Sequence, residues 1–183
     1  MDLTGKKLDL ERDGYIVAAD LLTGHEVAWY LECYDKILSG EIDAGQWRSD
    51  LGSGEPEKRA SVENITQVMW PSELIPALRT SPAYERALQI VRQLLGDDMA
   101  FDFDMLIDKA PGTDTPTPFH QDMAYWMDLP DKRALSCWIA LDEAAVDNGC
   151  MWFAPGSHRL PLRKHRWHGK SGGALECDGS EAE

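Results

Sequence analysis

The sequence predicts an α+β fold, in which helices come first and strands dominate the second half. Two stretches before Gly96 carry apolar residues at helical spacing, and after it apolar and polar residues alternate as in a strand. The chain has 183 residues, of which 43% are apolar, and this is enough for one domain with a core. We therefore expect a single domain over residues 1–183, with a sheet sandwich or barrel flanked by N-terminal helices.

The first helix is predicted to begin after Thr23, a good N-cap residue that is followed by Glu26 as in a capping box. Gly40 stands where a C-terminal glycine belongs. A second helix is predicted to open at Ser81-Pro82, with proline at its favoured first position, and to end at Gly96.

Strands are predicted where short apolar runs or period-two patterns occur. These segments are, in chain order, Tyr15–Ala19, Val62–Trp70, Met99–Ile107, Ala134–Leu141 and Gly149–Ala154. Residues 46–59 are rich in glycine, serine and charge, and we expect them to form a loop.

Composition argues against several classes of partner. The formal net charge of −14 disfavours nucleic acid and anionic membranes, because both are bound through clustered lysine and arginine. There is neither a long apolar run nor the pattern of a secretory signal. The four cysteines form no C-x-x-C pair, so we expect a reducing, cytoplasmic location.

The strongest chemical signal is His120-Gln121-Asp122, which follows the Pro- and Thr-rich loop 111–118. In a strand, residues i and i+2 point to the same face, so His120 and Asp122 can share one ion if they lie on a strand. Imidazole and carboxylate suit ferrous iron when a second histidine completes a facial triad. Such a triad leaves three positions open, enough for a chelating 2-oxo acid and dioxygen. The pattern alone also fits a solvated His-Asp pair.

Several motifs in order resemble the phytanoyl-CoA dioxygenase family, from about residue 10 to the end of the chain. They are D-G-Y at 13–15, M-L-I-D-K-A-P at 105–111, H-Q-D at 120–122, W-I-A-L at 138–141, N-G-C-M at 148–151 and P-G-S-H at 155–158. The resemblance implies a double-stranded β-helix, or jelly roll, with flanking helices. It implies a 2-oxoglutarate-dependent dioxygenase that uses Fe(II) and O2, with ascorbate in support.

The implied reaction hydroxylates an unactivated C–H bond of a small organic substrate and releases succinate and CO2. His120 and Asp122 match the family's two proximal iron ligands. Related halogenases lose this carboxylate, so Asp122 favours hydroxylation. Four further positions match or neighbour those that contact 2-oxoglutarate: Met105, Gln121, Trp138 and Gln67. At the last of these, some members carry a lysine.

The family's distal histidine ligand and the arginine that pairs with 2-oxoglutarate would lie beyond Glu183. We therefore expect a C-terminally truncated domain that lacks its last strands, has exposed sheet edges and turns over weakly or not at all. Three histidines of this chain are candidates to replace the missing distal ligand. His158 is expected to be structural, and His165 and His168 are expected to lie in a solvated loop or an anion-contacting patch, although their spacing could bind metal in a helix.

Two alternatives remain. One is a catalytically inactive jelly-roll binding domain, or fragment, without the third iron ligand. The other is an unrelated β-sandwich that uses some of the seven tryptophans to bind a ligand such as carbohydrate. That alternative predicts no tight 2-oxoglutarate binding and no effect of His120→Ala on metal affinity. Family members act on acyl-CoA esters, osmolytes and natural products, so the resemblance leaves the substrate open.

Overall fold

The computed structural model describes residues 3–51, 63–113, 115–167 and 174–178, and the chain divides into two compact units. The first unit combines residues 1–41, 75–102 and 129–160, and the second combines 42–74, 103–128 and 161–183. Every described helix of eight residues or more belongs to the first unit, and every described strand belongs to the second. This mixture of helices and small antiparallel sheets confirms the α+β class.

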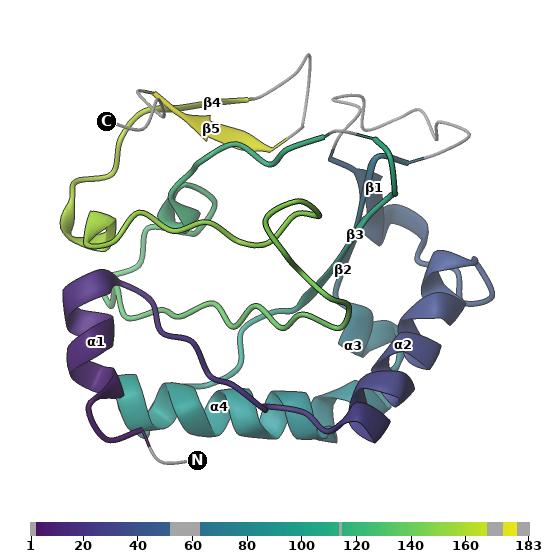
Figure 1. Cartoon of the computed structure of the whole chain (residues 1–183), viewed down its shortest axis with the longest axis horizontal. Coiled ribbons are helices and arrows are strands. Elements are labelled where there is room, and N and C mark those ends of the chain that lie inside the picture. The colour runs from purple at the N-terminus through teal and green to yellow at the C-terminus, as the bar shows by residue number, and fades with distance from the viewer. Residues whose placement is uncertain (1–2, 52–62, 114, 168–173, 179–183) are drawn as a thin grey trace. The chain divides into compact units, whose positions relative to one another are not determined.

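The helices of the first unit carry the predicted start and stop signals. Thr23 Oγ1 accepts a hydrogen bond from the Glu26 N–H at 3.3 Å, and a Glu26 carboxylate oxygen accepts one from the Thr23 N–H at 2.7 Å. The predicted capping box is therefore present. Gly96 ends the last long helix, as expected. The elements are α1 (Lys6–Asp13), α2 (Gly24–Leu38), η2 (Pro76–Thr80), α4 (Pro82–Leu95) and η4 (Ser157–Arg159) (Figure 1).

The helix α1 was not predicted, because it buries none of its residues and so lacks the apolar stripe that marks a helix in a sequence. The core of the first unit lies instead around Tyr30, Leu78 and Ala83, which are 1%, 0% and 6% exposed. The Tyr30 hydroxyl donates to Ser81 Oγ at 2.6 Å and accepts the Ala83 N–H at 2.8 Å. It therefore satisfies one of the unpaired donors at the start of α4.

Replacing Tyr30 with phenylalanine is expected to lower the free energy of unfolding by about 1–3 kcal/mol, because the buried Ala83 N–H loses its acceptor. Urea denaturation measures the change. The control is Tyr15→Phe, since Tyr15 stacks on Phe153 through its ring, with centroids 4.7 Å apart. Equal stability of the Tyr30→Phe variant and the wild type would contradict the capping role.

Two motifs from opposite ends of the sequence meet in the first unit. The Gly156 N–H, in the P-G-S-H motif, donates to the Asp13 carbonyl of the D-G-Y motif at 2.8 Å. Beside this bond lies the stacked pair of Tyr15 and Phe153. The expected strand at Tyr15–Ala19 is wrong, because this segment packs through side chains rather than through a backbone ladder.

The strands expected at Ala134–Leu141 and Gly149–Ala154 are also absent. A strand needs a neighbour to pair its N–H and C=O groups, and within the described residues neither segment has one. One tryptophan of each segment is exposed, with Trp138 50% and Trp152 63% exposed, whereas Ile139 and Leu141 of the first segment pack against the core around Tyr30.

The second unit holds two small antiparallel sheets. One has the order β1-β2-β3, from β1 (Arg48–Asp50), β2 (Ile65–Met69) and β3 (Met105–Lys109), and Figure 1 shows these strands together. The other pairs β4 (His165–Trp167) with β5 (Leu175–Cys177). Three short helices accompany them: η1 (Gly45–Trp47), α3 (Pro71–Leu74) and η3 (Asp122–Ala124).

The sequence predicted this unit in part. The strand expected at 62–70 is confirmed by β2, and β3 begins six residues later than the expected 99–107. The loop expected at 46–59 is wrong where η1 and β1 occupy residues 46–50, because β1 pairs with β2; residues 52–59 lie outside the described part. In the described ranges, no helix has the length and apolar character that spanning a membrane requires.

Candidate metal centre

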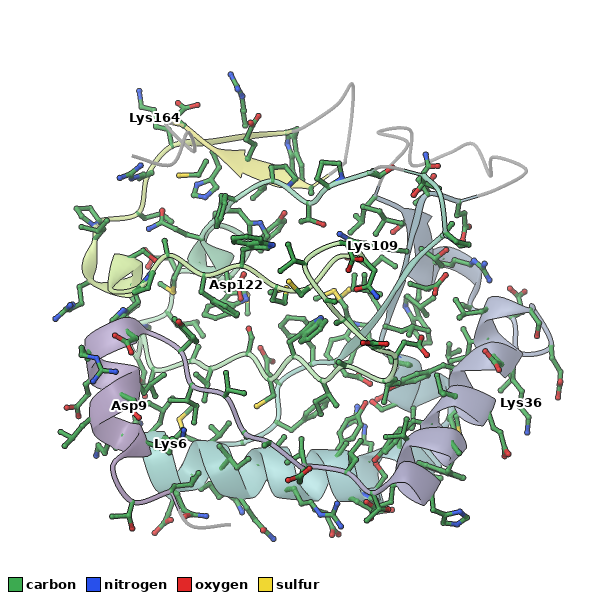
Figure 2. All side chains as sticks on the ribbon, in the orientation of Figure 1. Lys6, Asp9, Lys36, Lys109, Asp122 and Lys164 are labelled. Carbon is green, nitrogen blue, oxygen red and sulfur yellow. The ribbon has the colours of Figure 1, made fainter. Side chains whose placement is uncertain are left out.

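His120 and Asp122 lie close together in the second unit. The residue between them, Gln121, has an extended backbone with φ −107° and ψ 123°, so its two neighbours project to the same side. The segment is not a strand, because Asp122 begins the short helix η3. Figure 2 labels Asp122. Nε2 of His120 lies 3.3 Å from Oδ1 of Asp122.

The other ring nitrogen of His120 is fixed by the backbone. Nδ1 lies 2.8 Å from the Pro118 carbonyl oxygen, and because a carbonyl only accepts, Nδ1 is the donor. Nε2 is thereby directed to Asp122. The hydrogen bond with Asp122 raises the pKa of His120; partial burial opposes this, and the Pro118 carbonyl adds to it. The Tyr125 ring meets the imidazole edge-on, with centroids 5.5 Å apart.

The pair fits two ligands of one octahedral ion. With metal–ligand bonds of about 2.1 Å, two adjacent donor atoms lie about 3 Å apart. The 3.3 Å separation of Nε2 and Oδ1 needs little adjustment to reach this value. Side-chain exposures of 23% for His120 and 50% for Asp122 leave the carboxylate accessible. Among the residues that the structure describes, no group of three histidine, cysteine, aspartate or glutamate side chains converges for a metal.

Gln121 is held by the segment that leads into β4. Its N–H donates to Nε2 of His165 at 3.0 Å, its Oε1 accepts the Arg163 N–H at 2.8 Å, and its Nε2 donates to the Pro161 carbonyl at 3.2 Å. Its side chain therefore already has a partner at both ends of the amide. Contact between Gln121 and a co-substrate stays a prediction.

Gln67 and Met105 lie on one face of the three-stranded sheet. Gln67 is opposite Ile107, and side chains alternate along a strand, so Met105 and Lys109 share the face of Ile107. Figure 2 labels Lys109, the last residue of β3. Met105 and Ile107 are 44% and 39% exposed, whereas Leu106 between them is 8% exposed on the other face. Gln67 and Met105 thus share the more open face of the sheet, and their contact with a co-substrate stays a prediction.

The remaining candidates lie elsewhere. Trp138 belongs to the first unit, as does His158, which lies in η4. His168 is outside the described residues. His165 begins the strand β4, so the solvated loop expected there is wrong, and so is the helix that metal binding by His165 would have required. Contact of His165 with an anionic group stays a prediction. The bond between His165 and Gln121 could not be predicted, since no sequence pattern marks a hydrogen bond across 44 residues. The contact of the Tyr125 ring with His120 was also not predicted.

The comparisons with known proteins agree with the family resemblance of the sequence motifs between residues 13 and 158. The chain matches the family described as "Phytanoyl-CoA dioxygenase (PhyH)" over residues 10–178. It is 26% identical over 167 residues to the human peroxisomal phytanoyl-CoA dioxygenase and 32% identical over 167 residues to that of Bos taurus, in each case covering 87% of this chain and 49% of the relative.

A third relative is the ectoine dioxygenase of Sphingopyxis alaskensis, 29% identical over 155 residues, or 83% of this chain and 48% of the relative. The chain thus spans about half the length of the curated relatives it matches. No solved structure matches it significantly. Since the family match extends over most of the sequence, the chain belongs to the phytanoyl-CoA dioxygenase (PhyH) family.

Proposed function

We propose that the protein is an Fe(II)- and 2-oxoglutarate-dependent dioxygenase that hydroxylates an unactivated C–H bond of a small organic substrate. The observation that carries the proposal is the 3.3 Å approach of His120 Nε2 to Asp122 Oδ1 in a chain of this family. These two side chains would hold the iron. When bound, iron with 2-oxoglutarate and O2 supplies the oxidising chemistry, which leaves one oxygen atom in the product alcohol and releases succinate and CO2.

The chain's own residues would orient this site. The Pro118 carbonyl holds the proton on Nδ1 of His120, which leaves the Nε2 lone pair for the metal once the proton shared with Asp122 is displaced. Met105 and Gln67, on the open face of the sheet, and Trp138 are proposed to contact 2-oxoglutarate. A jelly-roll fold for the complete domain is part of the same proposal and is supported by the family match.

The names of the relatives specify two different substrates, phytanoyl-CoA and ectoine. The proposal therefore extends only to a small organic substrate. A cytoplasmic location is proposed because the cysteines that the structure describes are all free thiols. The net charge of −14 supports a partner other than nucleic acid or an anionic membrane.

Succinate formation tests the proposed function. The protein is incubated with Fe(II), 2-oxoglutarate, O2 and ascorbate, and succinate is measured. We expect slow formation that needs iron and disappears in His120→Ala, since the imidazole ligand is lost. His25→Ala is the matched control, because His25 is an exposed residue of α2, and this variant should match the wild type. Binding of 2-oxoglutarate without succinate would favour the inactive binding domain, and a lack of both would contradict the proposal.

A further inference from the structure

Several hydrogen bonds join the His120-Gln121-Asp122 segment to β4 and to the residues that lead into it. We propose that His165 is a positioning residue, which holds the Gln121 peptide so that His120 and Asp122 converge on one metal ion. The metal-binding part of this inference rests on the proposed function. Nothing in the sequence motifs assigns His165 a role, and its ring contacts the backbone of the segment rather than the two candidate ligand side chains.

Both ring nitrogens of His165 are engaged. The Arg163 carbonyl lies 2.9 Å from Nδ1, and since a carbonyl only accepts, Nδ1 carries the proton. The Gln121 N–H lies 3.0 Å from Nε2, and since a backbone N–H only donates, Nε2 is the acceptor. Nδ1 therefore donates and Nε2 accepts, and the Nε2 lone pair that could bind a metal is used by the Gln121 N–H. This geometry makes His165 a residue that supports the two candidate ligands, and it argues against His165 as the third metal ligand.

The Gln121 peptide, which His165 holds, controls how close His120 and Asp122 lie to each other. The extended backbone of Gln121 puts the side chains of His120 and Asp122 on the same side, and a rotation there would separate Nε2 from Oδ1. The Gln121 side chain reinforces the same link, because its amide bonds the Arg163 N–H and the Pro161 carbonyl. The segment is thus held at both its backbone and its side chain.

Two further bonds attach the flanks of the segment to β5. The Cys177 N–H donates to the Phe119 carbonyl at 2.9 Å, and the Leu175 N–H donates to the Tyr125 hydroxyl at 2.5 Å. Because β4 and β5 pair with each other, with His165 opposite Cys177, the contacts belong to one hairpin. Groups that orient ligands in this indirect way typically change metal affinity by about 10- to 100-fold when removed.

The test compares two substitutions at His165. His165→Ala removes the acceptor, whereas His165→Gln keeps an oxygen that can accept the Gln121 N–H and an amide that can donate to the Arg163 carbonyl. The dissociation constant for Co²⁺, a visible-absorbing substitute for Fe(II), is measured for the 183-residue protein. We expect about tenfold weaker binding in His165→Ala, recovery to within about threefold of the wild type in His165→Gln, and no change in the control His25→Ala.

A second measurement needs no metal. Amide hydrogen exchange of Gln121 in the metal-free protein should speed up in His165→Ala and return towards the wild-type rate in His165→Gln. Exchange at the amides of β2, which lies in the other sheet, reports whether each variant stays folded.

The outcomes separate the two proposals. If His165→Ala changes neither the Co²⁺ affinity nor the Gln121 exchange while His120→Ala still abolishes binding, the positioning role is overturned and the metal centre stands. If Co²⁺ binding does not depend on His120, the proposed function and the metal-positioning role fail together. Faster Gln121 exchange in His165→Ala would then identify a purely structural contact.

Discussion

Replacing Asp122 with alanine is expected to weaken the binding of Fe(II) or Co²⁺ by more than about 100-fold, beyond the loss expected for an indirect partner. The variant keeps His120 Nε2 but loses the carboxylate that approaches it to 3.3 Å, so a single protein ligand remains at this pair. Titration of the metal-free protein with Co²⁺, followed by absorption, measures the change. The Asp122 side chain is half exposed, so the free energy of unfolding should fall by less than about 1 kcal/mol.

Two variants make the Asp122 result interpretable. Asp122→Glu keeps a carboxylate at a longer reach, and we expect affinity between those of the alanine variant and the wild type. Asp102→Ala removes an equally negative but exposed aspartate of the first unit and should leave the affinity unchanged. An equal loss in Asp102→Ala and Asp122→Ala would show that net charge, rather than coordination, attracts the metal.

Features set by residues close in sequence could be predicted. The capping box of α2 joins residues three apart, and the glycine after α4 acts on its own helix. His120 and Asp122 are also neighbours, and one extended residue between them suffices to place both side chains on one side. The prediction assumed a strand, yet the geometry holds at the start of a turn, because it depends on Gln121 alone.

Features that depend on distant partners were predicted poorly. Apolar runs at Ala134–Leu141 and Gly149–Ala154 have the composition of strands but no ladder partner among the described residues. Conversely, β1 forms in an expected loop, because Ser49 lies opposite Gln67 of β2. The bond from Gln121 to His165 is of this second kind, since pairing of β4 and β5 brings the imidazole into place. Ladder partners and such contacts are decided by tertiary packing, which a local pattern does not encode.

Substitution of Gly14 by alanine is expected to lower the free energy of unfolding by about 2–5 kcal/mol. Gly14 has a φ of 85°, and a left-handed backbone costs a residue with a Cβ about 1–2 kcal/mol. A Cβ there would also lie 2.7 Å from Cγ of His158, and such overlap costs about 1–3 kcal/mol more. Relief of the overlap would pull the D-G-Y motif away from the P-G-S-H turn and weaken the bond from Gly156 to Asp13. Urea denaturation of the variant and the wild type measures the loss.

Two other glycines separate the backbone cost from the overlap at Gly14. Gly5 has a φ of 80° with nothing within 4 Å of the position that a Cβ would take, so Gly5→Ala should show only the backbone cost. Gly24 opens α2 without a positive φ and with open space around it, so Gly24→Ala should be neutral or slightly stabilising. Combining Gly14→Ala with His158→Ala removes the ring that the new methyl group meets. If the contact between the motifs is tight, the double variant loses less stability than the two single losses added together, whereas simple additivity would mean that His158 can move aside.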